Sequence, residues 1–183
     1  MANKRHYGAS ISTRPEIACI RLEEGHREVD TAVGKRAGEE SVVFSLLEKN
    51  AKTYLAFRVP SKTSEAVMGP TAALHDEYGE NFSRIFKTIT VDNGSEFADF
   101  AQVEQWGTKA FFAHPYTSWE RPQNERRNGL FCAFVPKEAS IEVFSDEDTL
   151  SAADELNGRP RKKLGYHTPE ELFDAFLDAV FAA

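Results

Sequence analysis

The order in which strand-like and helix-like patterns of hydrophobic residues follow one another along the chain constrains its fold more than any other feature. Arg27–Val33 alternates between apolar and polar side chains, and two short apolar runs follow at Ser41–Leu47 and Tyr54–Val59. Alternation with a period of two indicates a β-strand, and polar turns at Gly34–Gly38 and Lys49–Lys52 separate the three segments. Three strands with such short connections are expected to form an antiparallel meander.

The next apolar stretch has the spacing of a helix. Val67, Leu74 and Tyr78 lie at positions i, i+7 and i+11, and Ser61–Thr63 could cap the helix start. Gly69-Pro70 interrupts the stretch, so the helix either kinks there or begins only at the proline.

The rest of the chain alternates between strand and helix signals. Ser145 with Asp148 forms a capping-box pattern, and Thr168 begins another, with Pro169 at the first helical position. The predicted strands are Ile85–Asp92 and Lys109–Ala113. The predicted helices cover residues 97–106, Arg121–Phe134, residues 145–156 and the segment from Thr168 onward. This order predicts an α/β domain with a mixed five-stranded sheet flanked by helices.

Length and composition favour a single globular domain. With 183 residues, 41% of them hydrophobic, the chain can bury a substantial core. We expect residues 1–20 to be an arm or linker and residues 21–183 to form the folded core. No apolar run approaches the roughly 20 residues of a membrane helix, and residues 1–8 lack the apolar stretch of a secretory signal. Cys19 and Cys132 lie in no metal-binding pair, which favours reduced thiols in a cytoplasmic protein.

The net charge of −7 weighs against a DNA-binding protein, because DNA binding relies on neutralising phosphates. Basic residues nevertheless gather in two short segments, while the acids concentrate elsewhere. The two basic clusters are Arg121, Arg126 and Arg127, and then Arg159, Arg161, Lys162 and Lys163. Such clusters allow DNA contact on an acidic body, but they fit two solvated basic faces equally well.

Three carboxylates stand at positions from which they could converge. Asp30 lies inside the first strand, where burying a carboxylate is costly unless it is paired. Asp92 ends the fourth strand, and Glu125 lies near the start of a predicted helix. Each carboxylate also has a purely structural interpretation. Asp30 could be a hydrogen-bonded strand residue, Asp92 part of an Asp92-Asn93-Gly94 turn, and Glu125 an ion-pair partner of Arg121.

Three converging carboxylates would suit magnesium. Mg²⁺ takes carboxylate oxygens and keeps several waters, which leaves room for substrate phosphates. Two such ions about 3.5–4 Å apart can activate the attacking oxygen and stabilise the leaving oxygen of a phosphodiester. Clustered carboxylates repel one another, so a cation is needed to keep them ionised together.

Five phrases, in order, resemble the transposases of the bacterial IS-thirty family. The resemblance covers nearly the whole chain, from about His6 to Phe176. The phrases are REVDTAVGK (27–35), TVDNGSEFA (90–98), FAHPYTSWERPQNERRNGL (112–130), FVPK (134–137) and LNGRPRKKLGYHTPEELF (156–173). The resemblance implies a ribonuclease-H-like DDE core shared with retroviral integrases, which hydrolyses phosphodiesters and transfers DNA strands.

Matched residue by residue, the resemblance implies that Asp30, Asp92 and Glu125 are the catalytic metal ligands. Glu120 competes with Glu125 for the third position. The implied cofactor is Mg²⁺, with Mn²⁺ as a substitute and two ions expected when DNA is bound. Candidates for phosphate contacts are Arg121, Arg127, Lys162 and Lys163.

Several positions depart from the family pattern. Arg27 stands where the family usually has tryptophan. Pro122-Gln123 replaces the usual Gly-Thr, Arg126 replaces an asparagine, and the spacing from Asp92 to Glu125 is one residue shorter than usual. Most of these changes surround the third acid, so a catalytically inactive remnant, acting only as a DNA-binding or assembly module, is the alternative function.

The resemblance also predicts partners. DNA is expected as substrate, both as the ends of a mobile element and as target, with a homodimer or higher assembly on DNA and no membrane. The helix-turn-helix region that precedes the core in the family is expected to be absent, because residues 4–16 resemble the linker before the core. A two-carboxylate glycoside hydrolase is a further rival, but it explains none of the ordered phrases.

Overall fold

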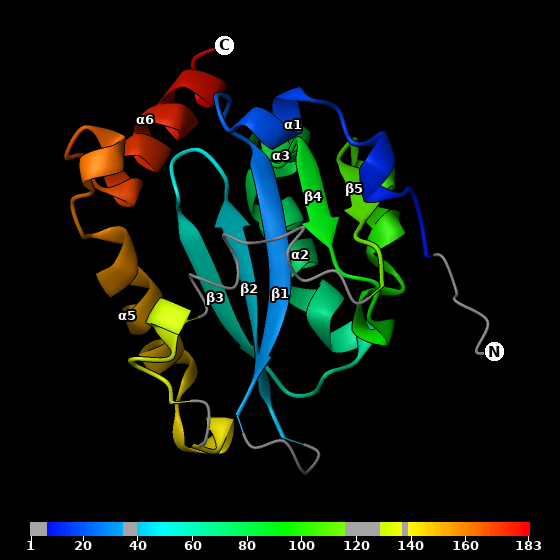
Figure 1. Ribbon diagram of the computed structural model, residues 1–183, viewed down its shortest axis with the longest axis vertical. Helices are drawn as coiled ribbons and strands as arrows, with labels where there is room; N and C mark the ends of the chain where they lie inside the picture. Colours follow the sequence, from blue (N-terminus) through cyan, green and yellow to red (C-terminus); the bar gives the residue numbers. More distant parts are fainter. Residues whose placement is uncertain (1–6, 35–39, 116–128, 137–138) are drawn as a thin grey trace.

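A computed structural model describes residues 7–34, 40–115, 129–136 and 139–183. Figure 1 shows a central twisted sheet with helices packed around it. The strands are β1 (His26–Val33), β2 (Val42–Glu48), β3 (Tyr54–Val59), β4 (Thr88–Val91) and β5 (Lys109–Phe112). None of the described helices has the length and apolarity that crossing a bilayer requires.

The sheet has the order β3-β2-β1-β4-β5, which puts the longest strand at its centre. β1, β2 and β3 pair antiparallel, while β4 and β5 add parallel to β1. Parallel neighbours need crossover connections, and the segments after β3 and β4 provide them. The predicted mixed five-stranded sheet, with its meander, is confirmed.

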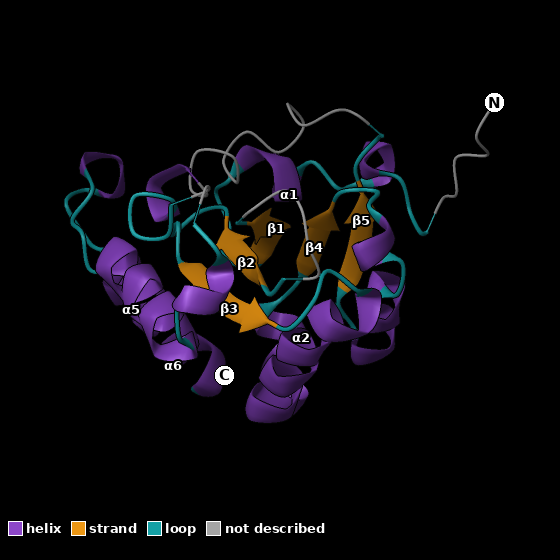
Figure 2. Cartoon of the chain, turned by 90° about the horizontal axis from the view of Figure 1, so that it is seen from below, coloured by secondary structure: helices purple, strands orange, loops and turns teal. Residues whose placement is uncertain are grey.

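Helices cover both faces of the sheet, as Figure 2 shows for α2 on one face and α1 on the other. The longer helices are α2 (Ser64–Tyr78), α5 (Asp146–Asn157) and α6 (Pro169–Phe181), and the short ones are α1 (Ile17–Ile20) and α3 (Phe82–Ile85). Short 3-10 segments complete the described structure at Ile11–Thr13, Gly79–Asn81, Ser95–Phe97, Phe100–Trp106, Ile141–Val143 and Lys162–Leu164.

Two hydrophobic clusters hold these layers together. On one face Val29, Ile89 and Val91 pack with side chains of α2 and α6. On the other face Val43 and Leu47 of β2 pack with side chains of α5. Because side chains alternate along a strand, each strand of the meander contributes to both clusters.

The segment around Pro70 resolves one alternative left by the sequence. The helix begins at Ser64, and the Thr63 side chain caps it by accepting a hydrogen bond from the N–H of Ala66. The helix continues through Pro70, with Val67 fully buried before it. A start at the proline is therefore wrong, because the earlier cap and apolar contact favour a longer helix.

The predicted strand Ile85–Asp92 begins too early. Phe82, Ile85 and Phe86 have the spacing i, i+3 and i+4, and all three are fully buried. Ile85 is therefore the last residue of α3, and β4 begins only at Thr88. The predicted helix over 97–106 is also wrong in type, because two 3-10 segments replace it. Of the predicted helix Arg121–Phe134, residues 121–128 lie outside the described residues, and the helix ends at residue 131.

Residues 7–20, predicted as an arm or linker, pack on the sheet. Ser10 forms a bridge with Phe112, and the N–H of Phe112 donates to the carbonyl of Ala9 at 2.8 Å. Ala18 is buried, and its carbonyl accepts a hydrogen bond from the Lys49 ammonium. This segment therefore extends the sheet edge beside β5 and covers part of one face.

Asn157, the last residue of α5, holds the start of the edge strand β3. Its side-chain oxygen accepts from the N–H of Tyr54, and its NH₂ donates to the carbonyl of Tyr54, both at 2.8 Å. We predict that Asn157→Leu lowers the free energy of unfolding by about 2–4 kcal/mol, because two buried hydrogen bonds are lost. Chemical denaturation measures the change, with Ser151→Ala on the exposed face of α5 as the control. An unchanged midpoint would show that Asn157 does not hold the strand.

Arg27 is buried in an aromatic pocket. Its guanidinium carbon lies 4.3 Å from the ring centre of Phe86 and 5.2 Å from that of Phe173. Among the described residues its three guanidinium nitrogens find no hydrogen-bond partner. Burial lowers the pKa of Arg27 to about 10, against the opposing charge of Glu48.

We predict that Arg27→Met stabilises the chain by roughly 1–3 kcal/mol, because an unbranched apolar side chain removes a guanidinium that is buried without a hydrogen-bond partner among the described residues. Glu48 keeps its three hydrogen bonds from the N–H groups of Gly25, Asn50 and Ala51. Thermal unfolding measures the change, and Arg84→Met on the exposed surface of α3 is the matched control. A lower melting temperature for Arg27→Met would mean that its attraction to Glu48 outweighs the desolvation of the guanidinium.

Candidate active site

Asp30 and Asp92 lie on the two strands at the centre of the sheet. Asp30 is inside β1, and Asp92 directly follows the last residue of β4. The parallel register sets Arg27 opposite Ile89 and Glu28 opposite Thr90. Continued by two residues, it sets Asp30 opposite Asp92, and paired side chains point to the same face of a sheet. The pairing therefore places both predicted residues two positions beyond its last pair, in β1 and directly after β4.

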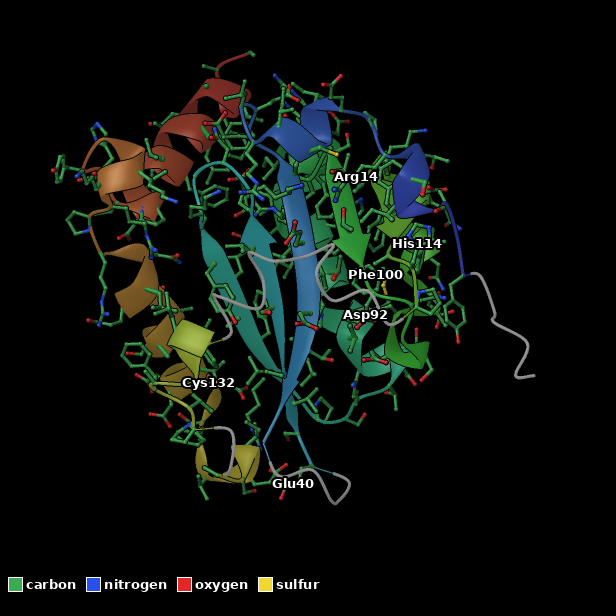
Figure 3. All side chains as sticks on the ribbon, in the orientation of Figure 1. Arg14, Glu40, Asp92, Phe100, His114 and Cys132 are labelled. Atoms are coloured by element: carbon green, nitrogen blue, oxygen red, sulfur yellow. The ribbon has the colours of Figure 1, made fainter. Side chains whose placement is uncertain are left out.

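Backbone N–H groups orient both carboxylates. Oδ1 of Asp30 accepts a hydrogen bond from the N–H of Thr31 at 2.9 Å. Oδ1 of Asp92 accepts one from the N–H of Gly94 at 2.8 Å. Both aspartates are half-buried, and Figure 3 shows Asp92 just beyond the arrowhead of β4. Each carboxylate is thus fixed by the residue or turn that follows it.

Glu96 is a third carboxylate near Asp92, and the sequence reasoning missed it. Its side chain is 7% exposed, and its Oε1 lies 2.9 Å from the Nζ of Lys62. The same oxygen accepts a hydrogen bond from the hydroxyl of Thr31 at 3.2 Å. The signal in the sequence was its position four residues after Asp92 in the phrase TVDNGSEFA, but nothing there indicated burial.

Basic and hydroxyl side chains lie beside the aspartates on the side of β4 and β5. Arg14 donates through Nη1 to the hydroxyl of Thr90 at 2.9 Å, two residues before Asp92 on the same strand face. The Nε2 of His114 lies 3.2 Å from the hydroxyl of Ser12. Figure 3 places Arg14, His114 and Asp92 on this same side of the molecule. The N-terminal segment thus contributes a cation close to the acidic strand ends.

The aspartate pair has the donor chemistry of a magnesium site. Two hard carboxylate oxygen donors come from β1 and from the end of the adjacent strand β4, and carboxylates that lie close together favour a cation between them. Within the described part of the chain, no group of three or more His, Cys, Asp or Glu side chains is arranged to hold a metal ion. Both candidates for the third acid, Glu120 and Glu125, lie outside the described residues.

The predicted phosphate contacts fall into two groups. Arg121 and Arg127 lie outside the described residues. Lys162 and Lys163 are exposed, in the 3-10 turn between α5 and α6. Figures 1 and 2 show α5 and α6 on the β3 side of the sheet, so the structure does not bring these lysines close to Asp92.

The other two basic residues of that loop are held by the protein itself. Arg159 pairs with Glu155 at 2.9 Å, and Arg161 donates to the carbonyl of Leu156 at 2.6 Å. Burial lowers the pKa of Arg161, and the charge of Arg159 adds to that effect. Arg159, Lys162 and Lys163 are exposed, but of these only Arg159 has an ion-pair partner among the described residues, so the two lysines remain the better candidates for phosphate contacts.

Comparison with proteins of known sequence shows what the chain is related to. No protein-family model matches it. The transposase of insertion sequence element IS1086 from Cupriavidus metallidurans is 35% identical over 92% of this chain and 48% of its own length. The probable transposase of IS1161 from Streptococcus salivarius is 31% identical over 94% of this chain and 48% of its own length.

Transposase InsI of element IS30C from Escherichia coli K12 is 29% identical over 91% of this chain and 42% of its own length. Among solved structures, the catalytic core domain of BIV integrase aligns with a TM-score of 0.61 and 19% identity. That alignment covers 85% of this chain and 97% of the viral domain.

The chain therefore has the fold of an integrase catalytic core, and the predicted ribonuclease-H-like class is confirmed. By sequence it is a homologue of insertion-sequence transposases, IS30 transposases among them, and the resemblance inferred from the ordered phrases is confirmed. The chain spans about half the length of the curated relatives it matches.

Proposed function

We propose that this chain is the catalytic core of a DDE transposase, which hydrolyses phosphodiester bonds and transfers DNA strands with a divalent metal ion. The observation that carries the proposal is the parallel pairing of β1 with β4, which, continued by two residues beyond its last pair, would set Asp30 opposite Asp92. The relationship to insertion-sequence transposases supplies the class of reaction. The integrase-type fold is consistent with this class of protein.

The metal we propose is Mg²⁺, with Mn²⁺ as a substitute and two ions when DNA is bound. Once bound, such ions polarise the phosphodiester and stabilise the charge that develops on the attacking and leaving oxygens. Asp30 and Asp92 would hold them, because each carboxylate is already oriented by a backbone N–H group. Such orientation lowers the cost of ordering the side chains when a ligand binds.

Glu125 is our proposal for the third ligand, and Glu120 is the competing residue. The proposal rests on the phrase that surrounds Glu125, since both glutamates lie outside the described residues. A single glutamate is needed to complete the carboxylate set, so the two candidates are exclusive and can be separated by mutation.

DNA is the proposed partner, both as element ends and as target. The net charge of −7 means that local cations must contact the phosphates. Arg121 and Arg127 are proposed to act close to the third acid, and Lys162 and Lys163 on the β3 side of the sheet. We propose a homodimer or higher assembly on DNA as the working state.

We predict that Asp30→Asn, Asp92→Asn and Glu125→Gln each reduce metal-dependent activity by roughly a thousandfold. Each substitution removes a ligand, and a loss of several kcal/mol in the transition state corresponds to that factor. Nicking and joining of plasmid DNA in Mn²⁺ would measure the activity, because this assay does not require the sequence of the element ends. Glu120→Gln is the matched control and should stay within a few-fold of the parent chain.

Two results would contradict this assignment. Full activity of Asp30→Asn or Asp92→Asn would show that these aspartates do not form the active site. Loss of activity with Glu120→Gln but not with Glu125→Gln would show that Glu120 is the third ligand. A parent chain that neither nicks DNA nor binds Mn²⁺ would instead support the alternative function, a catalytically inactive remnant.

A further inference from the structure

The two aspartates are oriented by N–H groups that belong to different segments. Thr31 continues β1, whereas Gly94 lies in the turn after β4. The described ladder between these strands ends at the pair Glu28 and Thr90, before either residue is reached. The distance between the two carboxylates therefore depends on what holds Thr31 and Gly94 in place relative to each other.

Glu96 contacts both residues. Its Oε1 accepts a hydrogen bond from the Thr31 hydroxyl at 3.2 Å. A Cβ atom built on Gly94 would lie 2.4 Å from Oε2 of Glu96 and 2.8 Å from Oδ1 of Asp92. The carboxylate of Glu96 is thus packed against the backbone of Gly94, where only glycine leaves room for it. These contacts form a continuous path from Asp30 to Asp92 through Thr31, Glu96 and Gly94.

Lys62 makes this arrangement electrostatically possible. Oε2 of Glu96 and Oδ1 of Asp92 both lie within 2.8 Å of that one Cβ position on Gly94, so the two carboxylates are close to each other. Two anions so close repel each other unless a cation neutralises one of them. The Nζ of Lys62, from the loop between β3 and α2, lies 2.9 Å from Oε1 of Glu96. The side chain of Lys62 is 47% exposed and that of Glu96 only 7%, so the ammonium lies on the solvent side of the pair.

We propose that Glu96 is a positioning residue, which with Lys62 fixes the turn carrying Asp92 against the strand carrying Asp30. The proposal rests on the proposed function, because it assigns a purpose to the spacing of the two aspartates. Glu96 is not assigned as a metal ligand, since among the described residues it forms no three-ligand group with the aspartates. It acts through Thr31 and Gly94, whose N–H groups set the two carboxylates.

The test measures Mn²⁺ affinity of the chain by electron paramagnetic resonance, together with thermal unfolding without metal. Glu96→Ala removes the link entirely, and Thr31→Val removes only the hydroxyl at nearly constant shape. Both should weaken Mn²⁺ binding by roughly tenfold to a hundredfold, the range for residues that orient metal ligands. Thr31→Ser restores the hydroxyl and should bind within a few-fold of the parent chain. Thr71→Val, at a buried threonine of α2 away from the site, is the matched control.

Asp30→Asn and Asp92→Asn, measured beside these variants, separate the two proposals. If Asp92→Asn loses Mn²⁺ affinity while Thr31→Val binds like the parent, the positioning role of Glu96 is overturned and the proposed function stands. If both aspartate variants also bind like the parent, the proposed function itself fails. If Glu96→Ala does not fold, the Mn²⁺ affinity of Thr31→Val decides the proposal. A Thr31→Ser variant that binds Mn²⁺ as weakly as Thr31→Val would also overturn the positioning role of Glu96.

Discussion

The parallel pairing of β1 with β4 is the constraint on which the rest of the site depends. Val29, Ile89 and Val91 are fully buried on the face covered by α2, and this packing fixes both strands in register. Because side chains alternate, burying Val29 on one face commits Asp30 to the other, and the same holds for Val91 and Asp92. A slip of one residue in either strand would bury a carboxylate in the hydrophobic core. The apolar core therefore determines the face of the sheet on which each of the two aspartates lies.

Charge in this protein is distributed around that constraint. On the strand face of the aspartates, Oε1 of buried Glu28 lies 3.7 Å from Nζ of Lys49. Glu96, which accepts a hydrogen bond from the hydroxyl of Thr31, pairs with Lys62. Each of these two buried anions has a cation beside it, which limits the cost of removing it from water. Arg27 lies on the opposite face, and its guanidinium has no hydrogen-bond partner within the described residues. It packs instead against two aromatic rings and is attracted by the charge of Glu48. The acidic net charge of the chain thus coexists with cations placed beside its buried anions.

Much of the fold could be predicted from sequence, because the first three strands and β5 carry strong alternation or short apolar runs between polar turns. The predicted start of β4 was wrong, because the spacing of the buried residues Phe82, Ile85 and Phe86 fits a helix better than a strand. Asp30 and Asp92 could be proposed because each is a carboxylate on or just after a predicted strand. Glu96 could not, because its partners Thr31 and Lys62 lie far away in the sequence and only the fold brings them together. The third acid came from resemblance alone, since no periodicity distinguishes Glu125 from Glu120.

The most direct test of the central claim is a crystal structure of the chain soaked in Mn²⁺, with anomalous diffraction to locate the metal. We expect a peak between the carboxylates of Asp30 and Asp92, with oxygen ligands at about 2.0–2.2 Å, near the distances that Mg²⁺ requires. A glutamate from the segment between β5 and α5 should complete its coordination. Carboxylates of Asp30 and Asp92 that do not face a common point, or a metal bound elsewhere with none at this pair, would contradict the claim.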